Sequence, residues 1–252
     1  MTAVLPQPDD PTRFVLYLRA VAFWLVFAST TLVAAILVVL MFPFSFASRQ
    51  AFVKGYVHFI LWWLRITCRL DYQIQGLDHI ASEACIVFSK HQSTWETFAL
   101  QVIFPPQIWV AKRELLWIPF FGWALALMKP IALNRGSGRA AVEQLVRQGR
   151  ERLTEGLWVI LFPEGTRVAP GKRGRYKIGG AVLAEQTGYP IVPVAHNAGE
   201  YWPRRSFLKY PGTVQVRIGP PIDPVGKSAQ EILNETSDWI ESSMAEITTL
   251  KE

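Results

Sequence analysis

The sequence predicts an α/β protein, a mixed and largely parallel sheet flanked by helices, with an N-terminal hydrophobic helical membrane anchor. From about residue 70 onward, short apolar runs alternate with helical patterns, which is the alternation typical of such sheets. Before them lies a run of 29 residues, 20–48, that carries no charge. We therefore expect a tail, an anchor and an interfacial helix in residues 1–69, and one α/β domain in residues 70–252.

The overall composition favours a membrane partner over nucleic acid. Half of the residues are hydrophobic and only 18% are charged, against about 25% in ordinary soluble proteins. The net charge of +6 would suit either partner, but ten tryptophans favour a membrane–water interface. The two cysteines, Cys68 and Cys85, give no disulfide framework, and Cys85 lies in an apolar run where packing is its expected role.

The first 48 residues predict a tail followed by a retained anchor. Residues 1–12 are polar with three prolines and predict a mobile tail. As one helix the uncharged run would be roughly 43 Å long, against a hydrocarbon core of about 30 Å. It is long for one upright span and short for two, so either one tilted span or a re-entrant hairpin is expected. Ser29, Thr30 and Thr31 would mark a bend in the hairpin, and Pro43 ends the helix.

The next segment predicts an amphipathic helix. Its aromatic stripe consists of Phe52, Tyr56, Phe59 and Trp63, and its basic stripe of Lys54, His58 and Arg65. An aromatic face backed by a basic face suits a helix in the headgroup layer. A helix that packs its apolar face on the core is the alternative.

After residue 70, seven apolar runs predict strands and five periodic segments predict helices. The strands are expected at 71–75, 84–88, 108–111, 131–133, 158–162, 191–194 and 214–218. The helices are expected at 94–102, 121–127, 138–153, 180–186 and 228–247. Ligands bind beyond the carboxyl ends of strands in such sheets. His91, Asn134-Arg135 and Pro163-Glu164-Gly165 each follow a strand, so we expect them to line one crevice.

His91 and Glu96 predict a general base and the group that orients it. A neutral imidazole accepts a proton well near pH 7, and a carboxylate on its other nitrogen fixes the tautomer. Ser93-Thr94-Trp95-Glu96 also fits an S-x-x-E capping box, so closing a helix N-terminus is the alternative role of Glu96. His196 follows a strand, and a structural role is the expected one.

A basic, glycine-containing segment follows the strand at 158–162. Between residues 164 and 180 it carries five cations and one anion, a composition that favours an anionic ligand or an anionic lipid surface. The sequence contains neither the G-x-x-x-x-G-K-[ST] motif that predicts an ATP site nor the G-x-S-x-G motif that predicts a serine esterase.

Several of these segments together resemble one known family. His91 and Glu96 are separated by four residues, and F-P-E-G-T-R stands unbroken at residues 162–167. Further matching residues are Lys112, Glu114, Leu115, Pro119, Phe121, Gly122, Leu133, Asn134, Arg135, Ile191, Val192, Pro193 and Val194. In this order they resemble the bacterial 1-acyl-glycerol-3-phosphate acyltransferases, within the glycerophospholipid acyltransferases. Two residues depart from the family: Glu96 stands where aspartate is usual, and Asn134 where an acid is usual.

The resemblance implies a membrane-associated acyltransferase that makes phosphatidic acid from lysophosphatidic acid. His91 would be the general base, oriented by Glu96, and the acyl group would pass directly from acyl-CoA or acyl-carrier protein without an acyl-enzyme. Arg135 and Arg167 would hold the acceptor's phosphate with Lys112 or Lys177. Glu164, Gly165 and Thr166 would belong to the same pocket. The resemblance implies no metal and no redox cofactor, because a thioester is already activated.

Three alternatives stay open at this point. The acceptor could be another lysolipid, such as a lyso-aminolipid without phosphate. The chain could be a non-catalytic lipid-binding membrane protein, or a hydrolase that releases the acyl group to water. An inner-membrane location with the catalytic domain facing the cytoplasm is expected from where the acyl donor resides, because the cations on the two sides of the anchor are nearly balanced.

Overall fold

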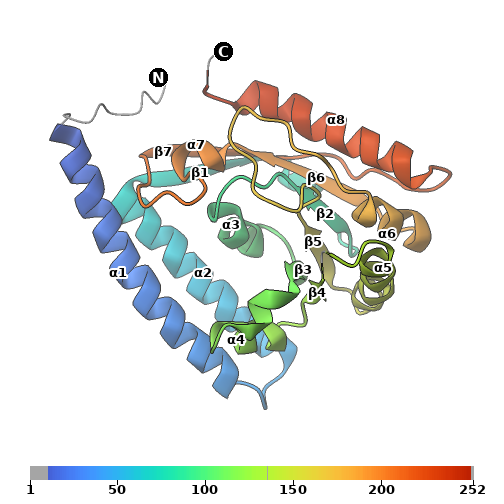
Figure 1. Ribbon diagram of the computed structural model, residues 1–252, viewed down its shortest axis with the longest axis horizontal. Coiled ribbons are helices and arrows are strands. Elements are labelled where there is room, and N and C mark those ends of the chain that lie inside the picture. The colour runs from blue at the N-terminus through green and yellow to red at the C-terminus, as the bar shows by residue number, and fades with distance from the viewer. Residues whose placement is uncertain (1–10, 135, 251–252) are drawn as a thin grey trace.

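The computed structural model describes residues 11–134 and 136–250. Its centre is a seven-stranded sheet in the order β1-β7-β6-β2-β5-β3-β4 (Figure 1). All neighbouring pairs are parallel except β6 and β7, which are antiparallel. The mixed, largely parallel sheet with helices around it is therefore confirmed.

Each of the seven predicted strands is present, with ends shifted by up to two residues. They are β1 (Leu70–Gln75), β2 (Ile86–Ser89), β3 (Gln107–Lys112), β4 (Ile131–Leu133), β5 (Trp158–Leu161), β6 (Ile191–His196) and β7 (Gly212–Ile218). Every residue of β2, β5 and β6 is buried, because helices cover both faces of the central sheet. This is why these strands read as unbroken apolar runs rather than as alternating patterns.

The helices form two groups around the sheet (Figure 1). On one side α5 (Arg139–Thr154), α6 (Gly179–Thr187) and α8 (Ala229–Ile247) pack on β2, β5 and β6. On the other side α3 (Trp95–Ile103) packs on α2 (Phe46–Cys68), and α4 (Phe121–Leu127) packs on α1 (Pro11–Leu40). The sequence did not predict the short helices η1 (Leu77–His79), η2 (Arg113–Trp117) and α7 (Ala198–Tyr201).

The N-terminal segment is a helical hairpin of α1 and α2, which lie side by side along one edge of the molecule (Figure 1). The bend expected at Ser29, Thr30 and Thr31 is wrong, since α1 is unbroken there. Each of these hydroxyls donates to the carbonyl four residues earlier, at 2.8, 2.6 and 2.5 Å, so the polar groups are satisfied within the helix. The expected tail lies outside the described residues except for Pro11 and Thr12, which already belong to α1.

The turn between the two helices is held by Arg49. It is the first charged residue after the apolar run, and its side chain is buried. Its Nη1 donates to the carbonyls of Met41, Phe42 and Phe44 at 3.4, 3.3 and 2.5 Å. These carbonyls lie in the turn after α1, where backbone acceptors lack helical partners. The arginine therefore closes the hairpin at residues 41–45, beside Pro43.

Helix α1 has the length and composition of a membrane-crossing helix over Arg13–Leu40, with a mean hydropathy of 2.5 and little of it buried. Large apolar side chains remain exposed along it and in the turn: Phe14, Leu18, Leu25, Leu32, Val33, Leu37, Leu40, Phe42 and Phe44. In α2 the side chains of Val57, Ile60, Leu61 and Leu64 are buried, whereas Phe59 and Trp62 are exposed. The helix thus packs one apolar face on the core, as the alternative expected, while a place in the headgroup layer stays a prediction.

Candidate active site

His91 lies two residues beyond the end of β2, over the end of the neighbouring strand β5. Its ring stacks on Phe162 with 3.9 Å between ring centroids and 10° between planes. Nδ1 is 2.8 Å from Oε1 of Glu96. The other ring nitrogen, Nε2, has no hydrogen-bond partner within residues 11–134 and 136–250, and 15% of the side chain is exposed. The imidazole is therefore oriented from within and open to a substrate on its outer nitrogen.

Glu96 is fully buried and accepts several hydrogen bonds. Its Oε1 accepts from the backbone N–H groups of Gln92 at 2.9 Å and Ser93 at 2.8 Å, and Oε2 accepts from Ser93 at 3.1 Å. Burial alone would raise the pKa of this carboxyl, but nearby His196, His91 and the N–H of Ser93 outweigh it and lower the pKa. Glu96 is thus an ionised carboxylate that fixes the proton of His91 on Nδ1.

The capping interpretation of Glu96 is also partly correct. The carboxylate accepts from the backbone of Ser93, as the glutamate of a capping box does. The reciprocal bond is missing, because Ser93 Oγ accepts from Trp95 N at 3.2 Å and donates to the carbonyl of Trp202 at 2.7 Å. One carboxylate therefore orders the start of α3 and orients the imidazole together.

Beneath His91 lies a buried network that sequence patterns did not predict. Oε2 of Glu164 accepts from the backbone N–H of His91 at 2.9 Å. Lys90 Nζ lies between Glu164 Oε1 at 2.8 Å and Glu241 Oε1 of α8 at 2.7 Å. The hydroxyl of Tyr176 donates to the same oxygen of Glu241 at 2.8 Å. The sequence offers one indication of this network, because Lys90 is a charged residue that directly follows a buried strand.

The network ties three distant segments to the backbone of His91. Burial raises the pKa of Glu164, and Lys90 counteracts that rise. The lysine and the glutamate are each about 1% exposed, so neither charge can be solvated if its partner is removed. Glu164 therefore shapes the site from the inside, by holding Lys90 and the N–H of His91.

Replacing Lys90 by methionine should destabilise the fold. Removing one partner from a buried ion pair leaves an uncompensated charge and costs about 3–5 kcal/mol. Lys129→Met is the matched control, since the Lys129–Glu155 pair is about 40% exposed and such pairs contribute no more than about 1 kcal/mol. Chemical denaturation of both variants in detergent measures the difference. Equal losses of unfolding free energy in the two variants would show that the buried ion pairs of Lys90 stabilise the fold no more than an exposed pair does.

The turn after β5 brings together the predicted residues Gly165, Thr166, Arg167 and Lys177. Gly165 has φ +66°, and a Cβ there would lie 2.8 Å from Lys177 Nζ, so the lysine side chain runs across the glycine. The backbone of Lys177 donates to Pro163 O at 2.8 Å. Arg167 is half-buried and Thr166 is exposed. The loop is also bonded to the backbone of His91, because Val168 N donates to His91 O at 2.8 Å. Two of the predicted cations thus lie on the segment that is bonded to His91.

On the side of β5 away from β2, the next strands of the sheet are β3 and then β4. Lys112 ends β3 and is the register partner of Leu133 in β4, and its ammonium lies 3.3 Å from Glu114. The amide oxygen of Asn134 accepts from Gly136 N at 3.1 Å and so forms a turn. Arg135 lies outside the described residues. The structure thus brings His91 together with the turn after β5, as expected, and describes the end of β4 up to Asn134.

His196 is structural, as expected. Nε2 bonds the carbonyl of Lys90 at 2.8 Å, and Nδ1 faces the N–H of Ala198 at 3.4 Å. Burial lowers the pKa of this imidazole. It supports the backbone just before His91.

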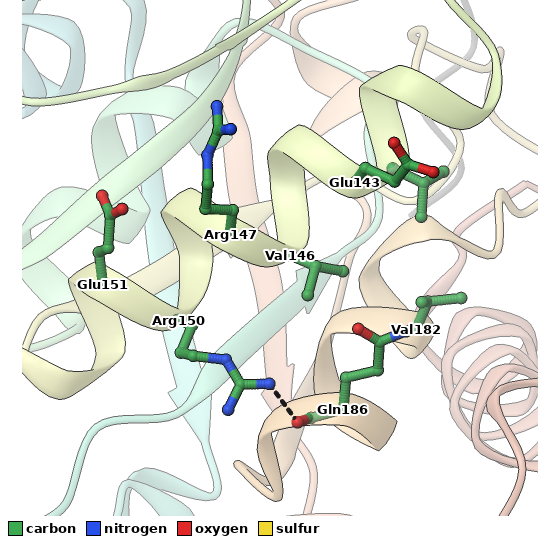
Figure 2. A pocket seen from close by; sticks show the side chains of 8 residues that line it. Glu143, Val146, Arg147, Arg150, Glu151, Val182 and Gln186 are labelled. Carbon is green, nitrogen blue, oxygen red and sulfur yellow. Dashed lines mark hydrogen bonds between the residues drawn. The ribbon is translucent and has the colours of Figure 1, made fainter.

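A separate hollow lies between α5 and α6 and holds none of the predicted site residues (Figure 2). Figure 2 shows Arg150 reaching across to the carbonyl of Gln186, a bond of 2.6 Å, while Arg147 and Glu151 point away from α6. The lining includes two arginines and two glutamates, so its charge is balanced and it does not favour an anion.

Comparisons with known proteins agree on one family. The family model described as "Acyltransferase" matches residues 71–197. The chain is 43% identical over 240 residues to a 1-acyl-sn-glycerol-3-phosphate acyltransferase of Pseudomonas aeruginosa, covering 93% of each chain. It is 31% identical over 245 residues to a chloroplastic protein of the same name from Brassica napus, covering 94% of this chain and 70% of that one. The fold matches the crystal structure of the 1-acyl-sn-glycerophosphate acyltransferase PlsC from Thermotoga maritima, with a TM-score of 0.79, 20% identity, and coverage of 95% and 99% of the two chains.

Proposed function

Because the chain belongs to the acyltransferase family that includes the 1-acyl-sn-glycerol-3-phosphate acyltransferases, we propose that it acylates lysophosphatidic acid to phosphatidic acid in phospholipid synthesis. The observation that carries the proposal is the orientation of His91. Its Nδ1 is held by a buried carboxylate, its Nε2 is free of partners within the described residues, and the F-P-E-G-T-R turn packs against its ring. This is the geometry of a general base beside an anion-binding turn.

The proposed reaction is a direct acyl transfer. Nε2 of His91 accepts the proton of the acceptor's free hydroxyl as its oxygen attacks the thioester carbonyl of acyl-CoA or acyl-carrier protein. A new oxygen–carbon ester bond forms and the carbon–sulfur bond breaks. The departing thiolate takes the proton back from the imidazolium. Glu96 stabilises that imidazolium while it exists. Because the thioester is already activated, the proposed transfer requires no acyl-enzyme and no cofactor.

The acceptor's phosphate is proposed to bind the cations of the turn after β5. Arg167 and Lys177 lie on the segment bonded to His91, and Lys177 crosses Gly165. A guanidinium binds phosphate through two parallel N–H bonds, whereas an ammonium acts as a point charge. Arg135 and Lys112 are proposed to complete the set from the ends of β4 and β3. Glu164, Gly165 and Thr166 shape the turn that presents these cations.

Membrane association is proposed through the helical hairpin. The exposed apolar residues of α1 continue around the turn at Phe42 and Phe44. An exposed apolar surface of this extent marks an interaction site, and both the acceptor and the product are lipids. We place the protein at the inner membrane with its catalytic domain facing the cytoplasm, where acyl-CoA and acyl-carrier protein are found. The full chain should then stay with the membrane fraction after washing in high salt, and its release by salt alone would contradict a hydrophobic anchor.

The acceptor assignment is tested by a panel of lysolipids offered with acyl-CoA. The full chain should acylate lysophosphatidic acid in preference to lyso-aminolipids without phosphate, and should release little free fatty acid when no acceptor is added. A preference for a lyso-aminolipid would move the activity to another lysolipid. Fatty-acid release at the rate of transfer would make the protein a hydrolase.

In the same assay Arg167→Ala should raise the KM for lysophosphatidic acid about 10- to 100-fold, because a hydrogen bond to a charged group contributes about 1.5–3 kcal/mol. Arg173→Ala is the matched control. Arg173 lies on the same loop, is exposed, and pairs with Asp238 of α8 at 3.1 Å, so its loss should leave KM nearly unchanged. Equal KM values for Arg167→Ala and the unaltered protein would exclude Arg167 from phosphate binding.

A further inference from the structure

Lys209 is a buried lysine enclosed by aromatic rings. Only 1% of it is exposed. Its Nζ lies 3.7 Å from the ring centroid of Trp24, 4.5 Å from Phe23, 4.9 Å from Trp202 and 5.7 Å from Phe207. It donates one hydrogen bond, to the carbonyl of Phe207 at 3.0 Å. Within residues 11–134 and 136–250 no carboxylate forms an ion pair with it, so the rings and one carbonyl replace its hydration.

The rings around Lys209 come from two parts of the chain that are far apart in sequence. Phe23 and Trp24 belong to α1, whereas Trp202 and Phe207 belong to the loop 202–211 after α7. The two parts also meet directly, because Trp24 Nε1 donates to Phe207 O at 3.0 Å, and the rings of Phe23 and Trp202 pack edge to face at 5.4 Å. Lys209 therefore lies at the joint between the hairpin and the α/β domain.

The same loop is bonded to the catalytic segment. The carbonyl of Trp202 accepts from Ser93 Oγ at 2.7 Å, and the backbone N–H of Ser93 donates to both oxygens of Glu96. A continuous path of contacts thus runs from α1 through Lys209, Trp202 and Ser93 to the carboxylate that orients His91.

An apolar residue would fill this position at a lower cost. Burial lowers the pKa of Lys209 to about 7, so the folded protein disfavours the ammonium form compared with water. A methionine has a similar unbranched shape, no charge to desolvate, and favourable sulfur–aromatic contacts. A lysine kept at such a position fits a role in function better than a role in stability, since functional sites are where proteins accept such costs.

We propose that Lys209 is a positioning residue for acyl transfer: it fixes Trp202 against helix α1, and through the Trp202–Ser93 bond it holds the segment that carries Glu96. The inference rests on the proposed function only in its activity assay, which measures acyl transfer to lysophosphatidic acid. The hairpin thereby does more than bind the membrane, because its docking on the α/β domain sets the geometry of the base.

The first experiment compares Lys209→Met with the unaltered full chain in its membrane. We expect kcat to fall about tenfold with an unchanged KM for lysophosphatidic acid, because one supporting interaction is lost while the phosphate site is not touched. We expect the temperature of unfolding to be unchanged or higher. A variant with unaltered kcat overturns the proposal, and so does one whose lost activity is matched by a lower unfolding temperature, since that would make Lys209 a packing residue. Lys227→Met, at a half-buried lysine paired with Glu235, is the control and should change neither quantity.

The path through Ser93 is tested by a double-mutant cycle. If Lys209 acts through the Trp202–Ser93 bond, Lys209→Met should have little further effect on kcat in a Ser93→Ala background. If the two losses multiply, the path is wrong. Trp24→Phe removes the Nε1 bond to Phe207 and weakens the ring contact with Lys209. It should therefore also lower kcat, but less than Lys209→Met does. It keeps the test usable if Lys209→Met fails to fold.

A measurement without substrate separates this inference from the proposed function. Between about pH 7 and the usual lysine pKa of 10.5 the unfolded chain holds a proton at Lys209 that the folded protein has lost. The unfolding temperature should therefore rise with pH above 7. The other groups facing this position are the thiol of Cys68, whose pKa burial raises, and Arg19 beyond it, so measurements that stop near pH 8 avoid the thiol. Lys209→Met should lack the rise, and an identical rise in the variant would contradict the buried environment of Lys209. An unaltered chain that fails to acylate lysophosphatidic acid would refute the proposed function alone.

Discussion

His91→Ala should abolish acyl transfer while the protein stays folded and membrane-bound. A positioned general base typically contributes about 10²- to 10⁴-fold in rate, so kcat should fall by about the same factor. Steady-state assays with lysophosphatidic acid and acyl-CoA, supported by a folding check in detergent, measure the loss. In the part of the chain that the structure describes, the side chain of His91 stacks on Phe162 and bonds Glu96, and both contacts can be lost without opening the core.

The matched control for His91 is His58→Ala. His58 is exposed on α2, far in sequence from the β2 and β5 ends, and its replacement should leave kcat and KM unchanged. Turnover of His91→Ala at the rate of the unaltered protein would refute the proposed mechanism. A protein that keeps its lipid binding and has no activity in either form would instead support a non-catalytic lipid-binding role.

Glu96→Gln should lower kcat by up to roughly 10⁴-fold, the loss seen when the residue that orients a catalytic histidine loses its charge. The amide cannot stabilise the imidazolium as a carboxylate does. Oε1 of Glu96 accepts from His91, Gln92 and Ser93, and Oε2 accepts from Ser93. An amide N–H₂ group in either position therefore puts a donor where the backbone N–H of Ser93 now has an acceptor. Glu96→Asp keeps the charge but withdraws it by one methylene, and should therefore retain substantially more activity than Glu96→Gln.

The control for Glu96 is a glutamate that only caps a helix. Glu231 forms a full capping box with Ser228 at the start of α8, and Glu231→Gln should leave activity unchanged, because glutamine also serves in a capping box. If Glu96→Gln were as active as Glu231→Gln, the capping role would be the whole role of Glu96. The order expected for kcat is unaltered protein, then Glu96→Asp, then Glu96→Gln.

The sequence predicted most of the fold because periodicity and helix signals are local. Seven apolar runs predicted the seven strands, and the periodic segment at 228–247 predicted α8. The bend expected in α1 was wrong for a related reason. Hydroxyl side chains inside an apolar helix can bond the preceding turn, so Ser29, Thr30 and Thr31 do not signal a break. The hairpin turn lies instead where Pro43 and Arg49 allow it to close.

The pair of His91 and Glu96 was visible in the sequence because both residues belong to one short segment and a strand end points them into one place. The support of that pair was not visible. Lys90 is held by Glu164 and Glu241, and Glu241 is 151 residues away in α8. Lys209 meets Trp24 of α1 across a sequence separation that no local pattern records. Such contacts depend on which elements pack together, and packing is set by the whole chain.

The sequence by itself therefore determined the strands, the main helices and the apolar N-terminal segment, because each is encoded over a few neighbouring residues. It also pointed to His91 and Glu96 as the pair proposed to act as base and orienting acid. Only the tertiary structure decided that Glu96 serves both as a cap and as the partner of His91, and that Glu164 faces inward to Lys90. It also decided that the hairpin joins the α/β domain at Lys209. The physical reason is that charges inside a protein are stable only when partners from other segments surround them, and those partners meet only after the chain has folded.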